Sequence, residues 1–375
     1  MSHISRTLLT LALTFATIPL LSRAQTSKTT GAVFVMTNNA SNNQVIAYNR
    51  NSDGSLTGRH SFATGGRGSG GLSDPLGSQG ALTLSQDHSF LLAVNAGSGD
   101  ISVFRVSGSA LTLVGTTPCG GSEPVAIAQS GHLVYVVNAG GTSNVSGFHL
   151  TSAGLLKPIP NSTAFLTTAN SGAASLAFSP NGQLLLVTEK LTNNIDAFAV
   201  QSDGTLGSIV VNPSAGAGLF GVLFTPSGVA ITTETGPTGG QDASAVSSYA
   251  INAGGMLSTI SASVPTLANA TCWHVVTPNG KLLYTSNPGS GSLSGFWISS
   301  AGALTPVDGT VLATLPNGSS NLDLAVTIDG KYLYTIDSGT GSVSVFAINT
   351  DGTLTTLTGV SGLAANAGFN GIAAI

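Results

Sequence analysis

The sequence predicts an all-β protein built as a seven-bladed β-propeller with four antiparallel strands in each blade. Three observations carry this prediction. One structural unit recurs along the whole chain, the composition of 49 Gly with abundant Val, Leu and Thr is typical of short strands and tight turns, and a spare strand stands at the C-terminus. Repeats of roughly 40–50 residues with four strands each are characteristic of propeller blades.

The repeat consists of an apolar strand, a Pro-Asn-Gly-like turn, a second apolar strand and a third alternating strand, and it is clearest in 176–206, 275–304 and 324–354. We define the residue that ends the second strand as the anchor of each unit. The seven anchors are Asn38, Asn95, Asn138, Glu189, Glu234, Asn287 and Asp337, at spacings of 43 to 57 residues. Because a lone blade cannot bury both its faces, the seven units must pack on one another in a closed ring.

Closure of the ring is predicted from the two ends of the chain. The first unit begins at its second strand, residues 32–37, and has no inner strand before it. The C-terminal segment 368–375 is a strand without a unit of its own. We expect this tail to form the innermost strand of the first blade, which would leave no open sheet edge in the ring.

The individual elements agree with strands and hairpins. Residues 101–106 and 343–348 alternate between apolar and polar side chains, as half-buried strands do. The dipeptides at 53–54, 203–204 and 351–352 are Asp-Gly, a favoured hairpin turn, and each falls between a third and a fourth strand.

The first 24 residues have the pattern of a secretory signal peptide. Arg6 precedes an apolar stretch from Leu8 to Leu21, and small residues flank the expected cleavage site after Ala24. The apolar stretch is too short for a membrane anchor. We therefore divide the chain into a signal peptide (1–24), a short linker (25–30) and a single propeller (31–375), and expect a secreted or periplasmic protein.

The charge balance limits the partners. Only 7% of residues are charged, against about 25% in typical domains. Without residues 1–24, nine basic and 15 acidic side chains remain, a net charge of −6 with no basic cluster. These features disfavour a nucleic-acid partner. No later apolar run reaches membrane length, so we expect no membrane span. We also expect the protein to be a monomer.

Two cysteines, Cys119 and Cys272, fall in linkers far apart around the predicted ring. A disulfide needs Cα atoms within about 7 Å, which this placement does not allow. The sequence therefore predicts two free, buried thiols.

The expected site lies at the channel mouth where the linkers between blades meet the loops between second and third strands. Five of the anchors are Asn or Asp, and the presence of each one taken singly is explained by its preference for turns. As a ring around a ligand, Asn95, Asn138, Asn287 and Asp337 would supply hydrogen bonds.

The three glutamates of the chain all map near this mouth. Glu189 and Glu234 are anchors of adjacent blades, and Glu123 begins an inner strand on the same face. Neighbouring carboxylates in a partly dry cleft raise one another's pKa, which suits a general acid or base. We therefore take Glu189 and Glu234 as candidate catalytic residues and Glu123 as a ligand-binding residue. The alternative is that they cap backbone N–H groups or pair with Lys190.

Starts of inner strands add candidates for the same rim, namely Gln79, Ser175, Trp273, His274, Asp323 and Asn370. Trp273 can either stack on a flat ligand or fill the channel, whereas His274, next in the strand, should point into the blade. The Gly-rich linker 65–71 is expected to be mobile, with Arg67 within reach of a ligand carboxylate.

No cofactor is expected. The Gly-rich linker lacks the strand–loop–helix context of a phosphate loop, and the histidines lack metal-ligand spacing. A channel Ca²⁺ held by Glu189, Glu234 and Asp337 is compatible with the sequence, because calcium prefers carboxylate oxygens.

The units at 179–198 and 277–296 resemble the lactonase-type seven-bladed propellers, which include the propeller-type 6-phosphogluconolactonase and the carboxymuconate lactonizing enzyme. Segments 187–190 and 243–251 resemble a secreted bacterial branch of that family. In the family's enzymes an Arg-His pair and a Glu are thought to act at the lactone. The resemblance places Glu189 at the Glu position, and Ala174 and Ser175 at the positions of the Arg and His.

Two functions are compatible with these residues. The first is an exported enzyme that hydrolyses or forms an unphosphorylated lactone or a similar sugar-like small molecule at the channel mouth. The second is a non-catalytic propeller that binds a glycan, a protein or an envelope component. An enzyme should keep an accessible, acid-lined channel, whereas a scaffold can fill it.

Overall fold

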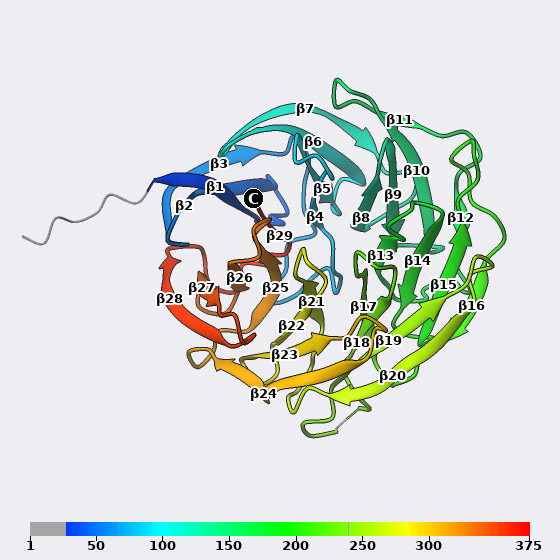
Figure 1. Ribbon diagram of the computed structural model, residues 1–375. Coiled ribbons are helices and arrows are strands. Elements are labelled where there is room, and N and C mark those ends of the chain that lie inside the picture. The colour runs from blue at the N-terminus through cyan, green and yellow to red at the C-terminus, as the bar shows by residue number, and fades with distance from the viewer. Residues whose placement is uncertain (1–27, 239) are drawn as a thin grey trace, which may run out of the picture.

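The computed structural model describes residues 28–238 and 240–375, and it places seven antiparallel sheets around a central axis (Figure 1). These residues form strands, turns and bends without a helix, so the predicted all-β propeller is confirmed. The expected signal peptide 1–24 lies outside the described residues. The first strand begins at Thr29, two residues before the predicted start of the propeller.

Each blade is a sheet of an inner, a second, a third and an outer strand. The inner strands are β4 (Leu82–Leu84), β8 (Pro124–Ser130), β13 (Ala173–Phe178), β17 (Leu219–Phe224), β21 (Trp273–Val276), β25 (Asn321–Val326) and β29 (Ile372–Ala374). The second strands are β1 (Thr29–Met36), β5 (Phe90–Asn95), β9 (Leu133–Asn138), β14 (Leu184–Glu189), β18 (Ala230–Glu234), β22 (Leu282–Asn287) and β26 (Tyr332–Asp337).

The third strands are β2 (Gln44–Asn51), β6 (Asp100–Ser107), β10 (Asn144–Leu150), β15 (Asn194–Ala199), β19 (Ala245–Ile251), β23 (Ser292–Ile298) and β27 (Ser342–Ile348). The outer strands are β3 (Leu56–Ala63), β7 (Ala110–Pro118), β16 (Val210–Pro213), β20 (Leu257–Pro265), β24 (Leu304–Thr314) and β28 (Leu354–Ser361), and in the third blade the outer position is split between β11 (Leu156–Pro158) and β12 (Ala164–Phe165).

The core lies between the blades, because the second strands are buried on both faces and carry large side chains. Tyr284 and Tyr334 are fully buried there. Each tyrosine hydroxyl donates at 2.9 Å to a glycine carbonyl in the Asp-Gly turn of the next blade, Gly352 and Gly54 respectively. Both glycines have a positive φ, 81° and 83°, which only glycine adopts readily in this turn. The Asp-Gly turns therefore also connect neighbouring blades.

The predicted clasp at the C-terminus is confirmed. β29 pairs antiparallel with β1, with Ile372 opposite Val35 and Ala374 opposite Val33. The C-terminus lies at the centre of the ring beside β1 (Figure 1). Arg50 adds a hydrogen bond of 2.8 Å from its Nε to the carbonyl oxygen of Ile375. The last strand of the chain thus completes the first blade.

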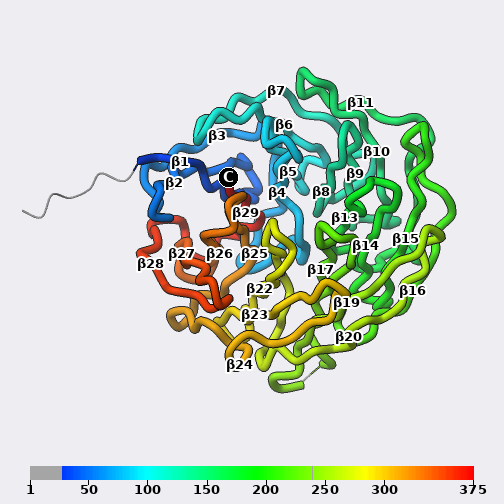
Figure 2. The backbone as a smooth tube through the Cα atoms, viewed as in Figure 1, coloured from blue at the N-terminus to red at the C-terminus, as the bar shows by residue number. Residues whose placement is uncertain are grey.

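The two faces of the disc differ in what covers the channel. We call the side where inner strands begin the linker face, and the side where they end, at the Pro-Asn-Gly turns, the turn face. The linker between β3 and β4, residues 64–81, passes close to the axis (Figure 2). Within this linker, the N–H of Gly70 donates to the carbonyl of Asn38, and the carbonyl of Arg67 accepts from the N–H of Gly97. The linker therefore contacts two blades as it crosses the linker face.

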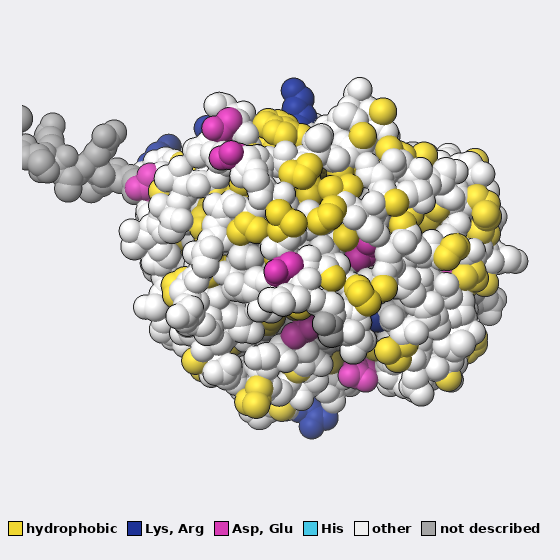
Figure 3. Space-filling model, turned by 90° about the horizontal axis from the view of Figure 1, so that it is seen from below, with side chains coloured by type: hydrophobic (Ala, Val, Ile, Leu, Met, Phe, Trp, Pro, Cys, Tyr) yellow, Lys and Arg dark blue, Asp and Glu magenta, His cyan; other side chains and the backbone are white. Residues whose placement is uncertain are grey.

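The surface agrees with the low charge of the sequence. On the face drawn in Figure 3, acidic and basic side chains are few, and two acidic ones lie close together near the upper left. Within residues 28–238 and 240–375, no helix has the length and apolar character needed to cross a bilayer.

Candidate functional site

A cavity of about 490 Å³ occupies the central channel, within the size range of small-molecule sites. All seven inner strands and their flanking residues line it. Along β8, β13, β17, β21 and β25 the side chains are buried at the start and become half-exposed at the end. The cavity is therefore closed toward the linker face and opens toward the turn face, opposite to the mouth that the sequence suggested.

Ser78 and Gln79, from the linker 64–81, lie at the closed end of the cavity, toward the linker face. The side chain of Gln79 donates at 2.6 Å to the carbonyl oxygen of His274, and the Gln79 N–H donates at 3.0 Å to that of Ala174. The indole N–H of Trp273 donates at 2.8 Å to the carbonyl of Ser78. The linker thus joins blades four and six across the axis. Its glycine-rich part, residues 65–71, makes backbone hydrogen bonds from Gly68 to Asn39 and from Gly70 to Asn38.

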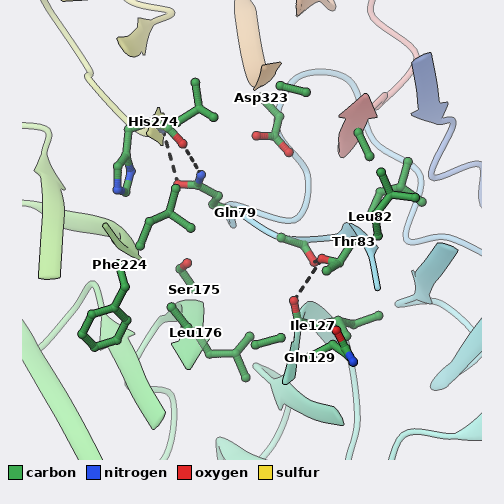
Figure 4. A pocket seen from close by; sticks show the side chains of 18 of the residues that line it. Gln79, Leu82, Thr83, Ile127, Gln129, Ser175, Leu176, Phe224, His274 and Asp323 are labelled. Atoms are coloured by element: carbon green, nitrogen blue, oxygen red, sulfur yellow. Dashed lines mark hydrogen bonds between the residues drawn. The ribbon is translucent and has the colours of Figure 1, made fainter. Parts of the chain in front are cut away.

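Four polar side chains gather at this closed end, namely Gln79, Ser175, His274 and Asp323. The Asp323 carboxyl and the Ser175 hydroxyl project into the space from different sides (Figure 4). The imidazole of His274 lies against the carbonyl of Ile231 at 3.2 Å, so it points into the blade as the strand alternation predicts. Inner-strand starts, rather than anchors, supply the polar groups of the cavity.

Asp323 is the one carboxyl among the residues that line the cavity. Its side chain is only 4% exposed, and Oδ1 accepts a hydrogen bond of 2.9 Å from the N–H of Leu324. Burial raises the pKa of Asp323 to about 7, although N–H groups of Leu324 and Ile372 lower it in part. At neutral pH both protonation states are populated, as proton transfer requires.

The electrostatics of His274 differ from those of Asp323. Complete burial lowers the pKa of His274 to about 3, so the imidazole is neutral at physiological pH. Its Nδ1 has no hydrogen-bond partner among the described residues. Around Asp323 the cavity lining therefore contributes no positive charge, since the lining contains neither Lys nor Arg.

Glu189 lies outside the cavity. It is fully buried, and its two carboxylate oxygens accept hydrogen bonds from the N–H and hydroxyl of Thr167 and from the hydroxyl of Thr192. Asp196 lies next to it on β15. Burial and the neighbouring Glu189 raise the pKa of Asp196 to about 8, so Asp196 is mainly protonated at neutral pH. Glu189 thus holds the linker that enters its own blade.

Glu234 occupies the equivalent place one blade later. It is 1% exposed and accepts hydrogen bonds from the N–H of Gly216 at 3.0 Å and from the hydroxyls of Ser247 and Ser263 at 2.6 and 2.7 Å. Gly216 belongs to the linker that enters blade five. The two glutamates are bound in separate blades, and neither contributes to the cavity lining.

The other anchors follow the same pattern. Asn95 accepts from Asn43 at 2.9 Å and from Thr64 at 2.7 Å, and Asn287 accepts from Thr271 at 2.6 Å. Further bonds join Asn138 to the carbonyl of Cys119 at 3.4 Å and Asp337 to the hydroxyl of Ser344 at 2.5 Å. The anchors fasten linkers and third strands, and the predicted ring of ligand-binding side chains around the channel does not form.

The remaining candidates lie on the linker face. Trp273 is fully buried with its ring 5.0 Å from that of Phe220, so it packs beneath the linker instead of facing a ligand. Asn370 donates at 2.9 Å to Asp74. Glu123 and Arg67 are exposed. None of these four predicted residues lines the cavity.

The three carboxylates considered for calcium do not meet. Glu189, Glu234 and Asp337 belong to three different blades, and among the described residues no three His, Cys, Asp or Glu side chains form a group suited to a metal ion.

The two cysteines are free and buried, as the sequence predicts.

Sequence reasoning did not identify the apolar walls. Toward the turn face the cavity is lined by Leu84, Ile127, Phe178, Phe224 and Val326. All five belong to inner strands, which surround the axis of a propeller, so the apolar character of these strands was the available signal.

The described residues thus form a closed ring of seven blades around a cavity of ligand size with one carboxyl in its lining. The chain belongs to the family described as "Lactonase, 7-bladed beta-propeller", which it matches over residues 24–165 and 230–369. No curated protein matches the sequence at a significant level.

Two bacterial proteins are among the solved structures of similar fold. A protein of Bacteroides uniformis, assigned provisionally as a 6-phosphogluconolactonase, is 19% identical with a TM-score of 0.68, covering 93% of this chain and 100% of its own. The periplasmic gluconolactonase PpgL of Pseudomonas aeruginosa is 17% identical with a TM-score of 0.66, covering 90% of this chain and 99% of its own. At these identities the likeness shows the fold.

Proposed function

We propose that this protein is an exported lactonase that hydrolyses, or in reverse forms, an unphosphorylated lactone in its central cavity. The single observation that carries the proposal is Asp323, a buried carboxyl that titrates near neutrality in the channel of a lactonase-family propeller. Titratable groups with strongly shifted pKa values in clefts are frequent at active sites.

The chemistry follows from the position of that carboxyl. In its charged form Asp323 accepts a proton from water while the water oxygen bonds to the lactone carbonyl carbon. The tetrahedral intermediate then collapses, the ring C–O bond breaks, and the proton passes from Asp323 to the leaving alkoxide, giving a hydroxy acid. The hydroxyl of Ser175 supplies a hydrogen bond to the carbonyl oxygen as negative charge develops there.

The absence of a phosphate from the substrate is inferred from the lining. A phosphate group in a protein site is usually held by Arg, Lys or a helix N-terminus. The residues lining this cavity include neither Lys nor Arg, and the one histidine among them, His274, is neutral because burial lowers its pKa to about 3. A phosphorylated lactone would therefore lose its hydration and gain no counter-charge.

For Glu189 and Glu234 we propose a supporting role. Both carboxylates are already saturated by hydrogen bonds from the linkers of their own blades. In the family, the position of Glu189 is thought to act at the lactone together with Arg and His, for which this chain has Ala174 and Ser175. A buried glutamate without those partners suits the linker-fastening role better.

The experiment is hydrolysis of a panel of unphosphorylated lactones by the purified protein, read as acid release, with Asp323→Asn and Glu189→Gln as variants. The proposal expects turnover that Asp323→Asn loses and that Glu189→Gln keeps wherever it is folded. Turnover lost in folded Glu189→Gln and kept in Asp323→Asn would return the catalytic role to the glutamate.

The second candidate function is that of a non-catalytic binding propeller. It is favoured because this chain has Ala174 and Ser175 at the positions where the family's enzymes have Arg and His. Absence of turnover across the panel would support it. Both candidate functions assume that the protein is exported and that residues 1–24 are removed. The protein isolated from the producing cell should therefore begin at Gln25, which N-terminal sequencing can establish.

A further inference from the structure

The distribution of polar groups along the cavity points to the kind of lactone it takes. Polar side chains occur near the open end too, but their hydrogen-bonding atoms are occupied. The hydroxyl of Thr83 donates at 3.0 Å to the carbonyl of Ile127, and that of Thr225 pairs with Ser227 at 2.9 Å. These groups have little capacity left for a ligand.

Gln129 at the open end is occupied in the same way. Its side-chain oxygen accepts from the N–H of Gln86 at 2.8 Å, and its amide nitrogen donates to the carbonyl of Gly131. The bonds fix the amide along the rim of the turn face. A hydroxylated ligand would have to break them to gain a partner there.

The closed end has the opposite character. The hydroxyl of Ser175 makes only one long contact, 3.5 Å to the carbonyl of Val222. The Asp323 carboxyl interacts only with backbone N–H groups, those of Leu324 and Ile372, and with no side-chain donor among the described residues. Both side chains are within 4% of complete burial. Free hydrogen-bonding capacity is thus concentrated at one end of the space.

Apolar side chains form the walls between the two ends. Leu176 and Leu324 are about 5% exposed and lie deeper, whereas Phe178, Phe224 and Val326 are half-buried nearer the turn face. Figure 4 shows Leu176, Ile127 and Leu82 around the same space as Asp323 and Ser175. The cavity is amphipathic along its axis, with a polar closed end and an apolar outer part.

We propose that the substrate is a lactone with an apolar substituent, such as an alkyl chain, whose ring binds at Asp323 and Ser175 and whose chain runs along the apolar walls toward the turn face. This inference rests on the proposed function. A sugar lactone fits less well, because its ring hydroxyls would be buried against Leu, Ile and Phe side chains without partners, which is unfavourable.

The test compares δ-lactones that share one ring: unsubstituted δ-valerolactone, a series with alkyl chains of increasing length, and glucono-δ-lactone. We expect kcat/KM to rise with chain length, by up to about fourfold for each methylene that becomes buried, until the chain reaches solvent. Glucono-δ-lactone should be the poorest substrate. A preference for glucono-δ-lactone, or no dependence on chain length, would overturn the proposal.

Two variants localise the effect. Val326→Thr keeps the shape of the wall and makes it polar, so it should lower kcat/KM more for the long-chain lactones than for δ-valerolactone and thereby reduce the preference for long chains. Leu191→Thr is the control, since Leu191 is 75% exposed and lies outside the cavity lining. An equal effect of both variants on chain preference would contradict the placement.

Binding measurements separate this proposal from the proposed function. Calorimetry with alkyl-substituted δ-lactams, which keep the ring and resist hydrolysis, reports on the cavity whether or not the protein is an enzyme. Lactam binding that tightens with chain length, without turnover of any lactone, would remove the lactonase proposal and keep the ligand class. Failure of all lactams to bind, or tighter binding of the gluconolactam, would overturn the ligand class itself.

Discussion

The side chain of Gln79 donates a hydrogen bond of 2.6 Å to the carbonyl oxygen of His274, which joins two residues 195 positions apart in the chain. Gln79 belongs to the linker between the first two blades, and His274 lies in the inner strand of the sixth. The bond spans the channel and closes it toward the linker face. The direction from which a ligand enters is thus set by one linker.

Replacing Gln79 by alanine should destabilise the protein. The His274 carbonyl would lose this donor next to a partly apolar cavity, at a cost of about 1–2 kcal/mol in the free energy of unfolding. Urea denaturation measures the change. Gln183→Ala is the matched control, because Gln183 is exposed and bonds only its neighbour Asn181. Equal stability of the two variants would show that the bond across the channel contributes nothing.

The hydrolysis rate should follow the ionisation of Asp323. Its pKa is raised to about 7, and only the deprotonated carboxylate accepts a proton from water. kcat/KM should therefore be low at pH 5, rise through about pH 7 and level off above it. The slope comes from one group, so it should not exceed tenfold per pH unit.

Asp323→Asn provides the control for that profile. The variant should lose about 10²–10⁴-fold in kcat/KM, and its residual rate should show no inflection near neutrality. If the inflection near pH 7 survives in Asp323→Asn, another group is responsible for it.

The fold could be predicted because its signals are local. The turn in which Gly352 takes a positive φ is readable from two residues, and the repeat recurs often enough to count blades. The C-terminal clasp was predictable for a related reason, since Ile372 and its neighbours form a strand with no blade of their own.

The site was less accessible to sequence reasoning because it depends on packing between distant segments. Nothing near Glu189 in the sequence shows that Thr167, 22 residues earlier, will supply both an N–H and a hydroxyl to its carboxylate. Nothing near Gln79 shows that it will reach blade six. Asp323 could be placed near the channel by strand alternation, but its burial and raised pKa could not.

Removing the C-terminal segment 368–375 should unfold the protein or leave it insoluble. The deletion removes β29, exposes the edge of β1 and takes away Phe369 and Ile372, each 5% exposed. Loss of one large core side chain alone costs about 2–5 kcal/mol, within the range of a whole domain's stability. Thermal unfolding monitors the effect, and a truncated protein with an unchanged melting temperature would contradict the clasp.

The buried carboxyl pair Glu189 and Asp196 should make the protein less stable as the pH rises. The pKa of Asp196 is raised to about 8 in the folded protein, against an ordinary value of 3.8. Between these values the folded state binds more protons than the unfolded state, so the free energy of unfolding falls by up to about 1.4 kcal/mol per pH unit. The loss is complete once the pH exceeds about 8.

Asp196→Asn tests this directly, because asparagine is close in shape to a protonated aspartic acid and can donate a hydrogen bond to Glu189. The variant should be more stable than the unmodified protein at pH 8, similar to it at pH 4, and less dependent on pH between the two. Asp203→Asn serves as the control, since Asp203 lies in an exposed hairpin turn and bonds only Thr205 through its side chain. If Asp196→Asn instead loses stability equally at pH 4 and pH 8, Asp196 is ionised in the folded protein and its pKa is not raised.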